Sequence, residues 1–83
     1  MEGLIMKNLL FTTQTCPNCP AAKVFLDVSG IDFDLVDASK PEGLNLARKY
    51  GVGSVPTLIV VDDKGGMTDS ASGLDDIEAL IEK

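Results

Sequence analysis

The feature that most constrains this chain is a pair of cysteines, Cys16 and Cys19, in the segment Thr15-Cys16-Pro17-Asn18-Cys19-Pro20. Thiols at this spacing can close a small disulfide ring or bind a soft metal ion. The sequence has no histidine and no third cysteine, so a closed zinc site would need carboxylates or a second subunit. We interpret the pair as a redox dithiol. Two alternatives stay open, namely structural cysteines and a half-site for a metal.

The composition is that of a compact, acidic protein. Apolar residues make up 45% of the 83 residues and charged residues 24%, which favours one folded domain over residues 1–83. The net charge of −6 disfavours contact with nucleic acid or anionic membranes and favours neutral or basic protein partners. No apolar run reaches the roughly 20 residues of a membrane span, and no export signal is recognised. A cytoplasmic monomer is therefore expected.

Hydrophobic patterning predicts four strands, at residues 4–11, 31–36, 57–61 and 67–72. The second alternates apolar and acidic residues, which is typical of a half-exposed edge strand. The third is the richest in β-branched residues and is expected at the centre of the sheet. The segment 62–66 predicts a hairpin turn that pairs the third and fourth strands antiparallel.

The first helix is expected to begin at Pro17, because proline is tolerated in a first helical turn, and to end at Gly30. This places Cys16 at the helix N-terminus and Cys19 within the first turn. The inward face is predicted from spacings of three and four and consists of Ala21, Val24, Phe25 and Val28.

Two further helices are predicted. Ser39 is the N-cap candidate of the second helix, which ends at Gly51 and has an inward face of Leu44, Ala47 and Tyr50. The third runs from residue 74 to the C-terminus. Its apolar stripe is formed by Leu74, Ile77, Leu80 and Ile81. The order of elements predicts an α/β fold with one mixed four-stranded sheet sandwiched between three helices.

This order, a Cys-Pro-x-Cys segment opening the first helix, and a Val-Pro-Thr segment before a central strand together resemble the thioredoxin-fold superfamily in its minimal βαβαββα form. The segment Cys16-Pro17-Asn18-Cys19 and the chain length resemble glutaredoxins. The segments Lys49-Tyr50-Gly51-Val52 and Pro56-Thr57-Leu58 resemble thioredoxins. The resemblance covers essentially the whole chain and implies a thiol–disulfide oxidoreductase.

The resemblance also implies the substrate-binding residues. Pro56 is expected to follow a cis peptide bond and to lie beside the cysteines, with the backbone of Val55 pairing with the client. Without the resemblance, a trans bond would be expected, since it is the commoner state of any X-Pro bond.

The resemblance gives two opposing indications about glutathione. The segment from Gly73 to Asp76 resembles the stretch with which glutaredoxins hold the glutamyl end of glutathione, which implicates Gly73, Asp75 and Asp76. The two aspartates are equally explained by the preference of a helix N-terminus for anions. Thr13 stands where many glutaredoxins carry a lysine that binds a glutathione carboxylate, and the chain lacks the tryptophan usual in thioredoxins.

A mechanism follows from the two thiols. The thiolate is the attacking species, and the positive end of a helix dipole is expected to stabilise it at Cys16. Cys16 would attack a client disulfide, and Cys19 would resolve the mixed disulfide, leaving a Cys16–Cys19 disulfide. Thr15, Pro17 and Asn18 complete the active-site loop. Lys23 could add positive potential near the thiols, although a solvated surface lysine is the commoner case.

The expected partners are disulfide-containing proteins and an electron donor, either a reductase or glutathione. No bound cofactor is expected beyond the redox-active disulfide. An alternative function is a binding module that holds a metal or an iron–sulfur cluster between two subunits. A second alternative is an interaction domain with unreactive thiols.

Overall fold

The computed structural model describes residues 7–82, so residues 4–6 of the first predicted strand lie outside the described range. The predicted order of strands and helices is confirmed. The elements are β1 (Lys7–Thr12), α1 (Cys19–Val28), β2 (Asp34–Asp37), α2 (Pro41–Lys49), β3 (Thr57–Val61), β4 (Met67–Ser72) and α3 (Leu74–Glu82).

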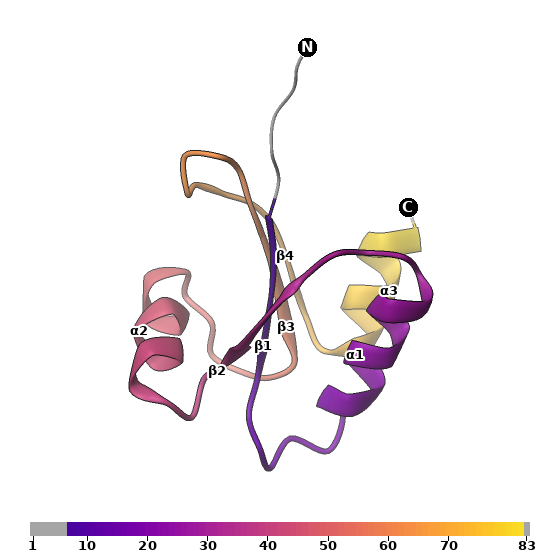
Figure 1. Ribbon diagram of the computed structural model, residues 1–83, viewed down its shortest axis with the longest axis horizontal. Helices are drawn as coiled ribbons and strands as arrows, with labels where there is room; N and C mark the ends of the chain where they lie inside the picture. Colours follow the sequence, from indigo (N-terminus) through magenta and orange to yellow (C-terminus); the bar gives the residue numbers. More distant parts are fainter. Residues whose placement is uncertain (1–6, 83) are drawn as a thin grey trace.

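The four strands form one mixed sheet in the order β2-β1-β3-β4 (Figure 1). β1 pairs parallel with β2 and antiparallel with β3, and β4 pairs antiparallel with β3. Leu10 of β1 therefore lies between Leu35 of β2 and Leu58 of β3. The predictions of a central β3, an edge strand β2 and a β3–β4 hairpin are confirmed.

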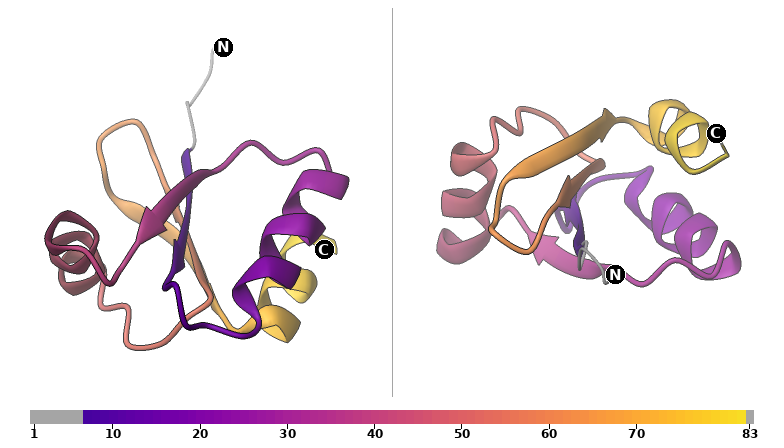
Figure 2. Two further views of the ribbon diagram at one scale, coloured as in Figure 1. Left: turned by 60° about the horizontal axis from the view of Figure 1, so that its bottom comes forward. Right: turned by 90° about the horizontal axis from the view of Figure 1, so that it is seen from above.

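The helices cover both faces of the sheet: α1 and α3 lie on one face and α2 on the other (Figures 1 and 2). Successive residues of the central strands point to opposite faces, so each face has its own apolar cluster. The α1/α3 cluster consists of Leu10, Ala22, Leu26, Leu58, Ala71 and Ile77. The α2 cluster consists of Phe11, Ala47, Ile59 and Val61.

The predicted start of the first helix is wrong, and of its four predicted inward residues Phe25 alone packs against the core, because Ala21, Val24 and Val28 are exposed. α1 begins at Cys19 rather than Pro17, and Val24 and Val28 are 60% and 83% exposed. The inward residues are Cys19, Ala22 and Leu26, with Phe25 partly buried. Two overlapping apolar stripes fit helical spacing in this segment. Cys19 is buried at the first helical position, and the residues three and seven positions later, Ala22 and Leu26, lie on the same face of the helix. This face is therefore the one that packs against the core.

The structure also corrects β2 and α2. β2 is shorter than predicted and shifted toward the C-terminus, and its Leu35 is half exposed. Lys40, not Ser39, is the N-cap of α2, and its side chain makes no capping bond. Ser39 instead donates a hydrogen bond from Oγ to Asp37 Oδ1. On the inward face of α2, Ala47 is buried, Tyr50 is partly buried, and Leu44 is 41% exposed.

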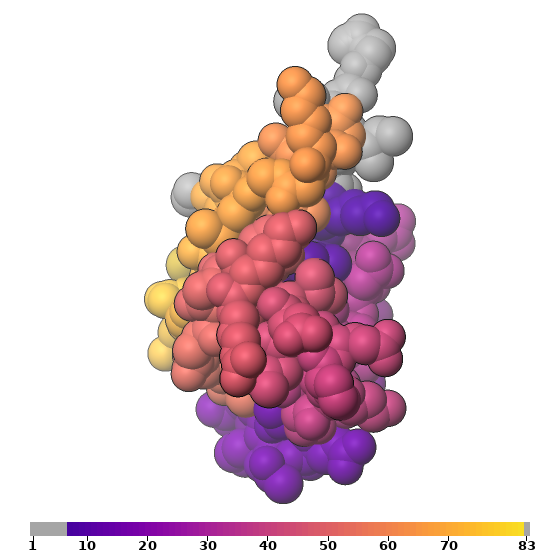
Figure 3. Space-filling view, turned by 90° about the vertical axis from the view of Figure 1, so that its left-hand side faces the viewer, coloured from indigo at the N-terminus to yellow at the C-terminus, as the bar shows by residue number. Residues whose placement is uncertain are grey.

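The third helix follows the prediction, because Ile77 is buried and Leu74, Leu80 and Ile81 pack against the same cluster. Seen from its α2 side, the molecule carries the β3–β4 hairpin at one end and the β1–α1 segment at the other (Figure 3). Among residues 7–82 there is no helix with the length and hydropathy needed to cross a membrane.

Candidate active site

The two cysteines lie where β1 passes into α1. Cys16 is half-buried in the turn before the helix, whereas Cys19 is 4% exposed at the first helical position. Their Cα atoms are 5.4 Å apart and their sulfurs form a disulfide. Thr15, Pro17 and Asn18 are exposed around the pair. Cys16 is therefore the more accessible of the two cysteines.

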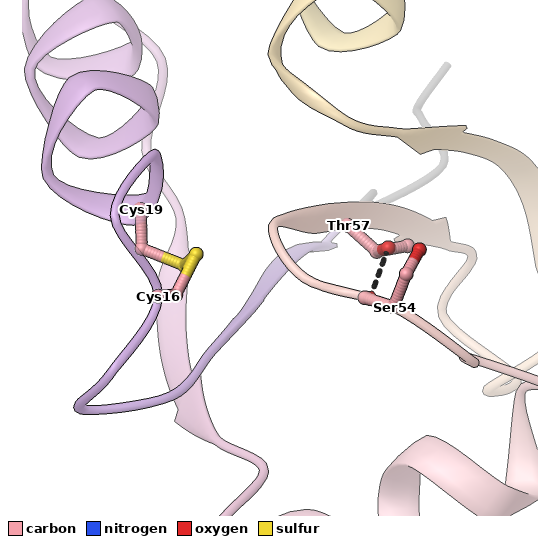
Figure 4. Close-up of a disulfide and its surroundings, with 4 residues drawn as sticks. All are labelled: Cys16, Cys19, Ser54 and Thr57. Carbon is pink, nitrogen blue, oxygen red and sulfur yellow. Dashed lines mark hydrogen bonds between the residues drawn. A yellow bond between two sulfur atoms is a disulfide. The ribbon is translucent and has the colours of Figure 1, made fainter.

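The Val55–Pro56 peptide bond is cis, and Pro56 is buried at the start of β3. Thr57 Oγ1 donates to the Ser54 carbonyl at 2.6 Å, which closes the loop immediately before the strand. Figure 4 shows the sulfurs of Cys16 and Cys19 directed from the start of α1 toward this loop. Segments about 40 residues apart in the sequence therefore face each other across the site.

The start of α3 joins the same region. The Gly73 N–H donates to the Pro56 carbonyl at 2.7 Å, and Gly73 has a φ of +87°, which favours glycine. Asp75 and Asp76 are exposed in the first turn of α3. The structure thus brings Gly73 to the cis-proline loop, and the two aspartates follow it on the outer surface of the helix.

A cavity of about 240 Å³ lies beside the disulfide. Its lining includes Cys16, Cys19 and Lys23 from the α1 side and Leu35 and Asp37 from β2. Sequence reasoning missed both β2 residues. The signal that could have found them is strand register, because Asp37 pairs with Thr12 at the end of β1, directly before the active-site loop.

A second cavity of about 210 Å³ adjoins the cis-proline loop. It is lined by Val52, Gly53, Ser54 and Val55 of the loop, by Leu44 and Ala47 of α2, and by Thr13 and Ala38. Thr13 borders both cavities, so they adjoin each other at the start of the β1–α1 loop. Val55 is half-buried there, beside an apolar surface.

Asp37 is the carboxylate in the cavity that holds the disulfide. The hydrogen bond from Ser39 Oγ to Asp37 Oδ1 is the main cause that lowers the pKa of this carboxyl group below its ordinary value of 3.8. The Ser39 backbone N–H donates to the same oxygen at 2.9 Å and lowers the pKa further. Asp37 therefore carries a negative charge at neutral pH.

In the described part of the chain, no three cysteine, histidine or carboxylate side chains gather closely enough to bind a metal ion. The two sulfurs supply only half of a tetrahedral thiolate site. A metal or an iron–sulfur cluster at Cys16 and Cys19 would thus require thiolates from a second copy of the chain.

Comparison with known proteins shows the family. Residues 8–65 match the family model described as Glutaredoxin. The chain belongs to the glutaredoxin family. A relative from Pseudomonas aeruginosa, named glutaredoxin, is 36% identical over 74 residues, which are 87% of this chain and 81% of that protein. A thioredoxin from Methanocaldococcus jannaschii is 37% identical over 60 residues, which are 65% of this chain and 68% of that protein.

Solved structures show the same fold. Thioredoxin-2, described as a component of the malaria parasite protein secretion machinery, superposes with a TM-score of 0.71 at 26% identity. That match covers 99% of this chain and 85% of the other. The oxidised thioredoxin of Plasmodium falciparum superposes with a TM-score of 0.74 at 21% identity, which supports the fold alone. The predicted thioredoxin fold and the predicted superfamily are confirmed.

Membership in the glutaredoxin family supports a general assignment to the thiol–disulfide oxidoreductases. The disulfide between Cys16 and Cys19 supplies the chemistry of that class. The family also implies redox partners such as disulfide-containing proteins or glutathione.

Proposed function

We propose that the chain reduces disulfides in client proteins, with Cys16 as the nucleophile and Cys19 as the resolving thiol. The observation that carries this proposal is the unequal exposure of the two cysteines opposite the cis-proline loop. Cys16 is the more accessible cysteine to a client, while Cys19 is almost completely buried and is bonded to Cys16. The roles of the two residues follow from this difference.

The reaction comprises two exchanges. The Cys16 thiolate attacks one sulfur of the client disulfide, the client S–S bond breaks, and the leaving thiolate takes up a proton. Cys19, as its thiolate, then attacks Cys16 Sγ and releases the second client sulfur. The client gains two electrons and two protons, and the dithiol becomes the Cys16–Cys19 disulfide. α1 begins at Cys19, three residues after Cys16, so the free backbone N–H groups of its first turn are expected to favour a thiolate at Cys16.

The cis-proline loop positions the client. Val55 lines a cavity together with Leu44 and Ala47. A client chain bound at this cavity would contact both the backbone of Val55 and the apolar side chains of α2. Main-chain hydrogen bonds to Val55 would hold the client in an extended conformation, as in strand addition. This geometry leaves the client sulfur free to approach Cys16.

Glutathione is one candidate electron donor, and a dithiol reductase is the other. The hydrogen bond from Gly73 to Pro56 brings the start of α3, with Asp75 and Asp76, to the client loop. If these aspartates hold the glutamyl end of glutathione, replacing both by asparagine should slow the reduction of the Cys16–Cys19 disulfide by glutathione. Reduction of the same disulfide by dithiothreitol should stay unchanged. Asp63→Asn in the exposed hairpin is the matched control.

Cysteine variants test the proposed roles. With a protein disulfide such as that of insulin as substrate, Cys16→Ser should abolish reduction. Cys19→Ser should stop turnover but accumulate a mixed disulfide between Cys16 and the client, detectable by mass. Reduction that survives in Cys16→Ser would contradict the assignment. Accumulation of the mixed disulfide on Cys19 in Cys16→Ser would reverse the two roles.

A further inference from the structure

A cavity of about 480 Å³ lies on the α2 face of the sheet, at the end away from the dithiol. Lys7 of β1 and Val61 of β3 pair at this end, whereas Phe11 and Thr57 pair at the end that leads into the active-site loop. Figure 3 looks at this face and shows the β3–β4 hairpin at one end of it and the β1–α1 segment at the other. The proposed disulfide reduction makes no use of this cavity.

The floor of this cavity is apolar. It is lined by Leu9 of β1, Val61 of β3, Leu46 of α2 and the adjoining Tyr50. Val61 is buried and the other three residues are half-buried. The Tyr50 hydroxyl donates a hydrogen bond to the Gly65 carbonyl at 3.3 Å, which ties the end of α2 to the hairpin and makes the ring a fixed wall. The floor therefore favours a ligand with an aromatic or aliphatic body.

The rim of the same cavity is acidic. Asp34 borders it from β2, and Asp62 and Asp63 border it from the hairpin. Lys7 is the only basic residue among the described residues of the lining, so three carboxylates face one ammonium group. Asp62 Oδ1 accepts hydrogen bonds from two backbone N–H groups of the hairpin turn, at 3.0 and 2.8 Å, which fixes the position of this carboxylate. The rim therefore favours a positively charged ligand.

We propose that this cavity binds a small organic cation, namely a protonated amine carried on an aromatic or aliphatic body. The body packs on Leu46, Val61 and the Tyr50 ring, and the ammonium group faces the carboxylates of the rim. The volume of about 480 Å³ lies in the range of about 300–1,000 Å³ that is typical of small-molecule sites. No cysteine lines the cavity, so this binding activity goes beyond disulfide exchange and does not depend on it.

Four probes separate the contribution of the charge from that of the apolar body. Tryptamine, tryptophol and indole-3-propionate carry an ammonium, a hydroxyl and a carboxylate group on the same indole ring and linker, and ethylamine carries an ammonium group without the ring. Dissociation constants are measured at pH 7 from the amide chemical shifts of the full-length, ¹⁵N-labelled protein. We expect tryptamine to bind about fivefold more tightly than tryptophol, and tryptophol more tightly than indole-3-propionate. Ethylamine should bind most weakly, because it leaves the apolar floor in contact with water.

Variants of the rim and of the floor test where the ligand binds. The double variant Asp62→Asn/Asp63→Asn removes two carboxylates, and asparagine keeps an Oδ1 that can accept the hydrogen bonds of the turn. It should weaken tryptamine binding by about fivefold and leave tryptophol binding unchanged. Asp27→Asn/Asp69→Asn removes the same charge from exposed positions outside the cavity and is the matched control, which should change neither. Leu46→Ala should weaken tryptamine and tryptophol by equal factors, because it removes apolar surface and no charge.

The same titrations state what would overturn the site. The shifted amides should lie around Leu9, Leu46 and Gly65, with equal dissociation constants in the oxidised and the reduced protein. Shifts centred on Cys16 and Cys19, or binding in one redox state alone, would place the ligand at the dithiol and overturn the inference. Equal affinities for tryptamine and indole-3-propionate, or no binding of tryptamine at millimolar concentrations, would do the same. An equal loss of tryptamine affinity in the control double variant would assign the effect to overall charge and would also overturn it.

Discussion

Gly43 lies on the buried side of α2, directly against the backbone of Asp37. A Cβ atom at this position would overlap the Asp37 carbonyl oxygen. The backbone of Gly43 does not have a positive φ, so the glycine is needed for close packing and not for its conformational freedom. This contact sets how closely α2 approaches the end of β2, where Asp37 faces the disulfide cavity.

Gly43→Ala tests this close approach. In a helix interior, alanine is normally more stable than glycine by about 1 kcal/mol. Here we expect the opposite sign, a loss of about 1–3 kcal/mol in the free energy of unfolding, because backbone atoms must move. Urea denaturation measures the change. Gly53→Ala, where nothing lies within 4 Å of the added atom, is the control and should stay within about 0.5 kcal/mol of the wild type. Equal stability of Gly43→Ala and the wild type would refute the contact.

The hydrogen bonds from Ser39 to Asp37 predict a pH dependence. They lower the pKa of Asp37 in the folded protein, so the ionised carboxylate stabilises the fold above its unfolded value of 3.8. This contribution is lost as the pH falls through the lower folded pKa. Ser39→Ala removes the main cause of the shift. Its unfolding midpoint should lie below that of the wild type at pH 7, and the difference should shrink below pH 3.8. A difference that does not change with pH would contradict the assignment.

Helix α1 shows why the presence of a helix was easier to predict than the face that it turns toward the core. The apolar residues of the segment fit two helical stripes that differ by a small rotation, and periodicity alone does not choose between them. The choice depends on the buried Cys19, which opens the helix. The same rotation leaves Val24 and Val28 exposed and turns Leu26 into the core.

Two substitutions in α1 test the observed orientation. Leu26→Ala should cost about 2–5 kcal/mol in the free energy of unfolding, because Leu26 is completely buried between the sheet and α3. Val24→Ala should change it by no more than about 0.5 kcal/mol, since Val24 is 60% exposed. Chemical denaturation of the two variants measures both effects. The reverse order would favour the face predicted from the sequence.

The parts of the site could be predicted from the sequence to different extents. The cysteines were found from their spacing, and the loop at Pro56 only through the family resemblance, because chain order says nothing about which loops meet. Asp37 and Leu35 were missed. They reach the cavity through the register of β2 on β1, and the sequence placed β2 three residues too early at its start.

At the scale of the whole molecule, the order of elements determined most of the fold. A βαβ crossover followed by a hairpin leaves few ways to arrange four strands, and the observed order β2-β1-β3-β4 has the predicted edge strand β2 and the predicted central strand β3. The result is a sheet covered on both faces, with the β1–α1 loop, the cis-proline loop and the start of α3 gathered at one end (Figure 1). The redox chemistry that we propose depends on this convergence.

The measurement that most directly tests this chemistry is a redox titration of the purified protein. The protein is equilibrated over a series of defined thiol–disulfide buffers, and free thiols are alkylated and counted by mass. We expect Cys16 and Cys19 to lose alkylation together at a single midpoint, without dimer formation. A midpoint near the thioredoxin value of about −270 mV would favour a reductase over an oxidant. If the pair never closes, or closes only between two chains, the proposed cycle is wrong.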